Sequence, residues 1–135
     1  MQNVLVVDDE CDVRDAIKRV LERAGYSVRT TGEAGEALAE LRRCVADIVI
    51  TDIIMPKING VEVIESICRE FPAVRIIAIS GGGNFGITAY QPTAITTSAY
   101  LAAAERAGAH WVLTKPFESN DLLNAVEQVL GAGHA

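Results

Sequence analysis

The sequence predicts an α/β fold in which a doubly wound five-stranded parallel sheet lies between two layers of helices. Half of the 135 residues are hydrophobic, which is enough for one compact domain with a buried core. Short runs of branched apolar residues without polar alternation indicate strands that are buried on both faces, as in a parallel sheet. Each run precedes a segment whose apolar residues recur at helical spacing. This alternation predicts (βα)5 units with right-handed crossovers, arranged as a three-layer sandwich.

Five segments are predicted to form strands. The clearest is Asp47–Thr51, where Ile48, Val49 and Ile50 form an unbroken branched apolar run. Residues 27–30 instead alternate polar and apolar side chains, which suits an edge strand. The predicted strands cover residues 3–7, 27–30, 47–51, 75–79 and 111–114.

Five amphipathic segments are predicted to form helices. They cover residues 12–24, 34–43, 61–71, 98–107 and 122–130. Gly25 and Gly108 are predicted to end the first and fourth helices, because glycine adopts the left-handed cap conformation easily. Pro72 ends the third helix, since the residue before a proline is pushed out of the helical region. Residues 119–121 (Ser-Asn-Asp) are candidate caps for the last helix.

The strongest apolar runs are the first, third and fourth strands, so the second and fifth are expected at the sheet edges. This ranking predicts the order 2-1-3-4-5, with the topological switch point between strands 1 and 3. Ligands of such sheets bind outside the carboxyl ends of the strands. Asp8, Asp9 and Asp52 therefore converge from strands 1 and 3, and Ser80 and Lys115 arrive from strands 4 and 5.

The expected cluster has a specific chemistry. Three carboxylates within a few ångströms repel one another, so at neutral pH they need raised pKa values or a cation. Mg²⁺ is the natural partner, because it prefers oxygen ligands and keeps room for phosphate oxygens. Lys115 adds a positive charge and Ser80 a hydroxyl. A carboxylate nucleophile, a metal, a lysine and a hydroxyl together form a site that accepts a phosphoryl group, and the expected product is an aspartyl phosphate at Asp52.

With these residues in view, the chain resembles a response-regulator receiver domain of two-component signalling, of the stand-alone, chemotaxis-regulator-like kind. The motifs that carry the resemblance are Val6-Val7-Asp8-Asp9-Glu10, Asp52-Ile53-Ile54-Met55-Pro56 with Gly60, Ala78-Ile79-Ser80 and Lys115-Pro116-Phe117. They lie within a resemblance that covers nearly all of residues 3–130. It implies a flavodoxin-like sheet and a single receiver domain over residues 1–135. The chemotaxis members are known for the order 2-1-3-4-5, so the predicted order and the resemblance are not independent.

The resemblance also implies a partner, a metal and an acceptor. Asp52 would accept a phosphoryl group from a histidine kinase or a histidine phosphotransfer protein. Asp9 and Asp52 would bind Mg²⁺ directly, together with the main-chain carbonyl of Ile54, while Asp8 would act largely through water. The domain would catalyse only its own phosphorylation and dephosphorylation, so it is not expected to be a metabolic enzyme.

The resemblance also implies roles for Ser80 and Lys115 and a route by which the signal leaves the domain. Ser80 would bond a phosphoryl oxygen, and Lys115 would contact the phosphate, aimed by a cis Lys115-Pro116 peptide. No output domain is expected after residue 130. The signal would then pass to an unknown downstream protein through the surface around the fourth helix, the last strand and the last helix, from a monomer or weak homodimer.

Two departures from the family pattern concern the last third of the chain. The position three before the lysine, where the family usually has an aromatic switch residue, is Val112. Trp111 stands one earlier and is expected on the other face of the strand. Between Ser80 and Lys115 lie residues 81–114, about a dozen more than the family pattern needs. The surplus falls in Gly81–Thr97, a glycine-rich segment that we expect to be a loop beside the site.

Composition limits the partners. The net charge is −6 and no lysine or arginine cluster is present, so a nucleic-acid surface is not expected. No signal peptide or membrane-spanning run is apparent, which favours a cytoplasmic protein without a membrane anchor. The three cysteines lack metal-site spacing and are expected to be reduced packing residues (Cys11, Cys44 and Cys68). His110 and His134 are expected at the surface.

Other functional hypotheses for the same residues stay open. A haloacid-dehalogenase-like phosphatase also uses an aspartate, Mg²⁺, a hydroxyl and a lysine, but its nucleophile follows the first strand in a DxDx[TV] pattern that is absent here. A flavodoxin-like nucleotide binder would need glycine-rich or hydroxyl-rich phosphate contacts after strand 1, where this chain is acidic. A phosphorylation-independent pseudo-receiver that acts as a docking module shares the fold but would not need the full set of site residues. Taken alone, the acidic run at residues 8–10 could also be a solvated helix start.

Overall fold

The computed structural model describes residues 2–53, 60–80, 102–115 and 117–132. Its elements are β1 (Asn3–Val7), α1 (Cys11–Arg23), β2 (Ser27–Thr31), the 3₁₀ turn η1 (Ala34–Glu36), α2 (Ala37–Arg43), β3 (Ile48–Asp52), α3 (Gly60–Glu70), β4 (Arg75–Ser80), β5 (Trp111–Thr114) and α5 (Ser119–Ala132). Residues 102–107 are also helical. The predicted alternation of strands and helices is therefore confirmed.

The five strands form one parallel sheet in the order β2-β1-β3-β4-β5, as predicted. β1 and β3 pair with Val7 opposite Thr51, and β4 pairs with β5 so that Ser80 lies opposite Thr114. Every residue of β3 is buried, because this central strand is covered on both faces. Since all strands are parallel, their carboxyl ends meet at one edge of the sheet.

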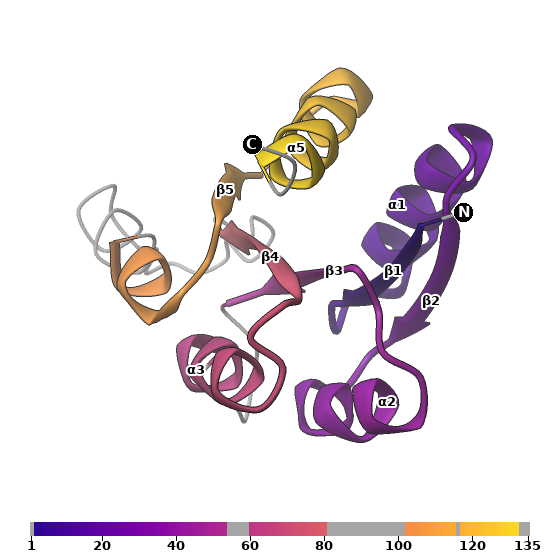
Figure 1. Cartoon of the computed structure of the whole chain (residues 1–135). Helices are drawn as coiled ribbons and strands as arrows, with labels where there is room; N and C mark the ends of the chain where they lie inside the picture. Colours follow the sequence, from indigo (N-terminus) through magenta and orange to yellow (C-terminus); the bar gives the residue numbers. More distant parts are fainter. Residues whose placement is uncertain (1, 54–59, 81–101, 116, 133–135) are drawn as a thin grey trace, which may run out of the picture.

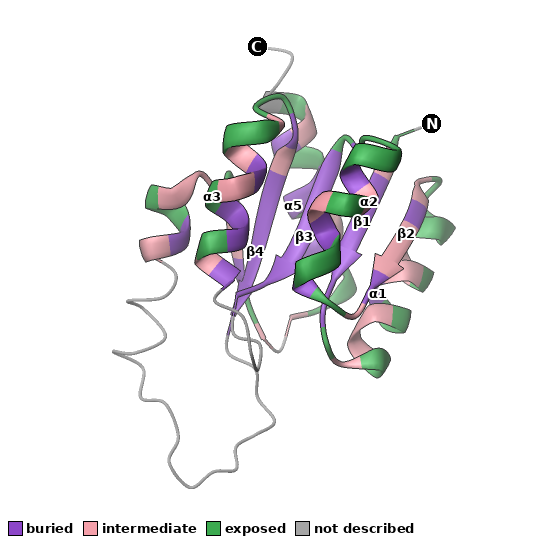
Figure 2. Ribbon diagram, turned by 90° about the horizontal axis from the view of Figure 1, so that it is seen from below, coloured by how far each residue is buried: buried purple, intermediate pink, exposed green. Residues whose placement is uncertain are grey.

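Helices cover both faces of the sheet, which gives three layers (Figure 1). One core lies under α1 and α5 and is built around Val4, Ile17, Ile50 and Val126. The other lies under α2, α3 and the helix at 102–107, and includes Ala104 from that helix. Figure 2 shows the buried strands enclosed by helices that are buried on one side only and exposed on the other. The apolar residues at helical spacing are the ones that make these two cores.

The predicted helix ends are correct at both glycines. Gly25 has φ +103° and Gly108 has φ +128°, the left-handed conformation that glycine adopts without steric cost. The second helix differs from the prediction, because its first turn is the separate 3₁₀ turn η1. In α5, Asp121 accepts a hydrogen bond from the Glu118 main-chain N–H at 2.9 Å. This bond satisfies one of the donors that a helix start leaves free.

The prediction that all three cysteines pack inside the domain is wrong, and the prediction that His110 lies at the surface is confirmed. Cys11 and Cys44 are exposed rather than packed, and only Cys68 contacts the core, although all three are free thiols as expected. His110 is exposed as predicted, and its Nδ1 accepts a hydrogen bond from the Ile76 main-chain N–H at 3.1 Å. Partial desolvation of the imidazole and the nearby charge of Arg75 lower the pKa of His110.

Some predictions lie outside the described residues. They concern the Gly81–Thr97 loop, the first residues of the fourth helix, the carbonyl of Ile54, the Lys115-Pro116 peptide and His134. In the part of the chain that the structure describes, no helix is long and apolar enough to cross a membrane.

Candidate functional site

Two carboxylates lie at the carboxyl ends of the central strands. Asp52 is the last residue of β3 and Asp8 directly follows β1. The pairing of Val7 with Thr51 brings these two positions side by side. Asp8 is 0% exposed and Asp52 is 2% exposed. Because buried carboxylates are costly without a partner, this pair requires a cation nearby.

Lys115 supplies one positive charge to this pair. Its Nζ lies 3.1 Å from Asp52 Oδ2 and 3.3 Å from Asp8 Oδ2, and the side chain is 10% exposed. The Lys115 main-chain N–H donates to the Ser80 carbonyl at 2.8 Å, which extends the β4–β5 pairing beyond Thr114. The extended β4–β5 pairing therefore brings Lys115 to Asp8 and Asp52 from the side of β3 that lies opposite β1.

Glu10 is the third carboxylate of the group. Its Oε1 lies 3.0 Å from Lys115 Nζ, and one oxygen each of Asp8, Glu10 and Asp52 lie within 4.8 Å of one another. The structure does not bring Asp9, which is exposed, into this group. Direct metal binding by Asp9 therefore stays a prediction.

Burial and charge act in opposite directions on these groups. Burial raises the pKa of the Asp8 carboxyl, although the Glu10 N–H and Lys115 partly oppose the shift. Burial alone would lower the pKa of Lys115, but the carboxylates of Asp52 and Asp8 outweigh it, so the pKa lies above its ordinary value. Lys115 is therefore a permanent cation at neutral pH.

Ser80 ends β4 beside the acid group and is 0% exposed. Its Oγ has no hydrogen-bond partner among the described residues, and neither has Asp8 Oδ2, although Lys115 lies within ion-pair distance of that oxygen. Unsatisfied buried polar atoms are rare and need a reason. Here they leave one donor and one acceptor available to a ligand at this edge of the sheet.

The residues present fit a divalent cation. Three carboxylates and one lysine leave two negative charges, and carboxylate oxygens are the ligands that Mg²⁺ prefers. Asp8 Oδ2, which accepts no hydrogen bond from the described residues and lies 3.3 Å from Lys115 Nζ, is a ligand atom that already lies in place. The described residues that could hold the ion are thus Asp8, Glu10 and Asp52.

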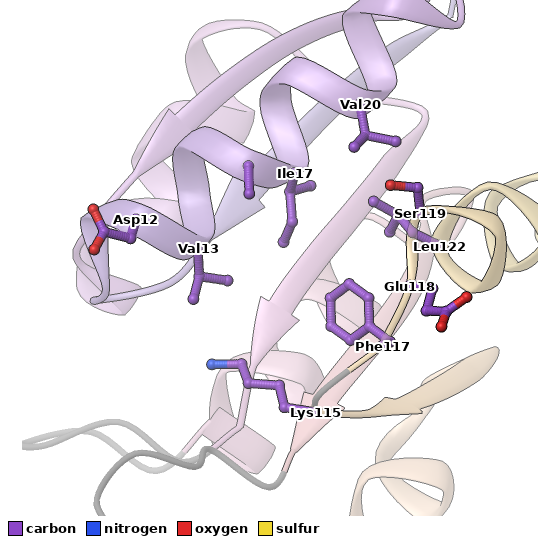
Figure 3. A pocket seen from close by; sticks show the side chains of 10 residues that line it. Asp12, Val13, Ile17, Val20, Lys115, Phe117, Glu118, Ser119 and Leu122 are labelled. Carbon is purple, nitrogen blue, oxygen red and sulfur yellow. The ribbon is translucent and has the colours of Figure 1, made fainter.

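A pocket of about 280 Å³ lies beside Lys115, between α1 and the start of α5. Figure 3 shows Val20 at one end of the pocket and Lys115 at the other, with Ile17, Phe117 and Leu122 forming apolar walls between them. The surface next to Lys115 on this side is therefore largely apolar, although Asp12 and Glu118 are among the lining residues.

Comparison with known proteins decides the family. A family model described as the response regulator receiver domain matches residues 4–127 of this chain. The chain belongs to this family. The receiver domain has the fold expected from the resemblance, and its acidic site lies where the two-component family would place a phosphorylation site.

The relatives show how much the likeness covers. The DNA-binding transcriptional regulator NtrC of Azospirillum brasilense is 36% identical over 129 residues, which are 96% of this chain but 24% of NtrC. This chain thus spans about a quarter of that regulator. Chemotaxis protein CheY of Thermotoga maritima is 31% identical over 129 residues, 95% of this chain and 97% of CheY.

A solved structure agrees with these matches. The crystal structure of a CheY-like response regulator receiver domain protein from Methanospirillum hungatei superposes with a TM-score of 0.82 at 26% identity. The match covers 98% of this chain and 95% of that one.

Four of the predicted site residues meet at the edge of the sheet as expected: Asp8, Asp52, Ser80 and Lys115. Glu10 was missed, although it stands in the same acidic run. The signal that identifies it is conformational, since the Glu10 N–H donates to Asp8 Oδ1 at 2.9 Å and this turn aims Glu10 at Lys115.

Proposed function

We propose that Asp52 accepts a phosphoryl group from the phosphohistidine of a histidine kinase or a histidine phosphotransfer protein. The observation that carries the proposal is the ion pair of Asp52 with Lys115 at 3.1 Å, on a carboxylate that is 2% exposed at the end of the central strand. An unpaired charge with this burial would be costly, so the ion pair with Lys115 is what allows the Asp52 carboxylate to serve as a nucleophile.

The transfer is a displacement at phosphorus. An Asp52 oxygen attacks the phosphorus of phosphohistidine, an O–P bond forms, and the N–P bond breaks. The departing imidazole keeps the bonding electron pair and takes up a proton. Lys115 Nζ is placed to turn from the carboxylate to the phosphoryl oxygens, and the Ser80 hydroxyl supplies a donor that has no other partner among the described residues. Mg²⁺, held by Asp8, Glu10 and Asp52, would neutralise the charge of the transferring group.

The product would act as a switch or as a phosphoryl carrier. Phosphorylation replaces the Asp52 carboxylate by a larger dianion, so the ion pairs of Lys115 must rearrange. Lys115 belongs to the chain segment that leads from β5 to Phe117 and α5, and Phe117 packs on the core under α1. A rearrangement at the site can therefore reach a partner surface through protein contacts.

The test is intact mass spectrometry after treatment with a small acyl phosphate, with and without Mg²⁺. The native chain is expected to gain one phosphate only when Mg²⁺ is present, and Asp52→Asn is expected to gain none. Asp15→Asn, which changes an exposed aspartate on α1, is the matched control and should behave like the native chain. No adduct on the native chain, with a donor that phosphorylates another receiver domain, would reject the proposal and favour a docking module that works without phosphorylation.

A further inference from the structure

Arg14 ties α1 to the acidic turn at residues 8–10. Its Nη1 donates a hydrogen bond to the Asp8 main-chain carbonyl at 2.8 Å, and its main-chain N–H donates to the Glu10 carbonyl at 3.0 Å. The side chain is half-buried. The Arg14 side chain therefore holds the main chain at the start of the turn that carries two of the three clustered carboxylates, and the first helical hydrogen bond of α1 holds its end.

The rest of the turn is fixed by bonds that involve Asp8 itself. Its N–H donates to the Thr31 carbonyl at 3.2 Å, and its Oδ1 accepts from the Glu10 N–H at 2.9 Å. Asp8 Oδ2 is consequently turned toward Lys115. Because the carboxylate is bonded to its own turn, its direction depends on the main-chain position that Arg14 holds.

Gly32 leaves the space that the Arg14 side chain occupies. A Cβ at position 32 would lie 2.6 Å from Arg14 Nη1 and 3.2 Å from its Cζ. Both distances are shorter than van der Waals contact, so any larger residue at this position would displace the guanidinium. Arg14 and Gly32 thus form a matched pair, one on α1 and one just after β2.

We propose that Arg14, seated against Gly32, is a positioning residue that aims the carboxylates of Asp8 and Glu10 at a divalent cation. The proposal rests on the proposed function, because it assigns a role toward the metal of that same site. Partners that hold the ligands of a metal in place typically affect metal affinity by 10–100-fold.

Position and charge have opposite consequences here, which makes the proposal testable. The positive charge of Arg14 lies near the acid group and by itself repels a cation. If Arg14 acted through charge alone, Arg14→Gln would strengthen Mg²⁺ binding and Arg14→Lys would leave it unchanged. If Arg14 acts by position, both variants weaken binding. Gly32→Ala removes no charge and is expected to weaken binding too.

The experiment is calorimetric titration of the full chain with Mg²⁺, accompanied by urea unfolding of each variant. Arg14→Lys, Arg14→Gln and Gly32→Ala are each expected to bind Mg²⁺ about tenfold more weakly than the native chain. Arg19→Gln, on an exposed position of the same helix, is the charge-matched control and should not weaken binding. Gly108→Ala is the control for stability, since it strains the chain next to Cys68, away from the acid group.

The outcomes are distinct. If the native chain binds Mg²⁺ and the Arg14 variants bind it equally tightly or more tightly, the positioning role is overturned and the proposed function stays intact. If Gly108→Ala loses as much Mg²⁺ affinity as Arg14→Lys, the positioning role is also overturned, because lower stability alone would then explain the effect. Absence of Mg²⁺ binding in the native chain would reject the metal site, and the positioning role with it.

Discussion

Replacing Lys115 by methionine is the perturbation that tests the electrostatics of the site most severely. Lys115 Nζ lies within 3.3 Å of an oxygen of each of three carboxylates, and two of them, Asp8 and Asp52, are almost fully buried. Removing one partner from a buried ion pair costs about 3–5 kcal/mol, because the remaining charge stays desolvated. Glu10 is partly exposed and can turn to water, so we expect a loss near the lower limit, about 3 kcal/mol.

The assay is urea unfolding at pH 7, followed by the fluorescence of Trp111, which packs against the core under α1 and α5. Lys18→Met is the matched control, since Lys18 pairs with Glu22 at 2.8 Å on the exposed face of α1. Surface pairs of this kind contribute only about 0.3–0.5 kcal/mol.

Mg²⁺ provides a second arm of the same experiment. A ligand at a hundred times its dissociation constant stabilises the folded state by about 2.7 kcal/mol. Because the ion would replace the charge that Lys115→Met removes, Mg²⁺ is expected to stabilise this variant more than the native chain. Equal losses in Lys115→Met and Lys18→Met, or no response of the former to Mg²⁺, would refute this account of the site.

Three further predictions concern residues outside the group of carboxylates and Lys115. Gly60→Ala would place a Cβ 2.4 Å from the Ile53 Cα, where only backbone could yield, so a loss of about 1–3 kcal/mol is expected in urea unfolding; native-like stability would contradict it. Gly108→Ala strains a φ of +128° and meets Cys68 Sγ at 2.3 Å. Adding Cys68→Ala should relieve the contact but not the backbone strain, and full recovery of the melting temperature would show that the strain is negligible. The pKa of His110 is lowered in the folded chain, so its contribution to stability is present above pH 6.5 and is lost as the pH falls through the lowered value. Unfolding curves between pH 7.5 and 5 should therefore converge for the native chain and His110→Ala; curves that stay parallel would exclude this role.

Much of the fold and part of the site follow from local patterns in the sequence. Branched apolar runs such as Ile48–Ile50 identify the buried strands, and their ranking identifies the edges. Parallel strands end at one edge of the sheet, so Asp8, Asp52 and Lys115 had to meet there once the order was known. The position of Val112 and Trp111 on opposite faces follows from strand geometry and is confirmed by their packing in different cores.

The features that the sequence did not reveal depend on the path of the main chain between elements. Glu10 reaches Lys115 because its own N–H is bonded to Asp8, and no periodicity encodes such a turn. The same turn leaves Asp9 exposed. The bond that His110 accepts from the Ile76 N–H likewise depends on how the chain enters β5 beside β4. Side-chain type alone gives no signal for these contacts.

The central claim is that Asp52 is the acceptor, and locating the phosphoryl group on the chain tests it most directly. After treatment with a small acyl phosphate and Mg²⁺, borohydride reduces an aspartyl phosphate to homoserine, which peptide mass spectrometry can locate. Homoserine at position 52, absent without Mg²⁺, is the expected result. Homoserine at position 8 or 9, or at no aspartate of a chain that did gain a phosphate, would contradict the account.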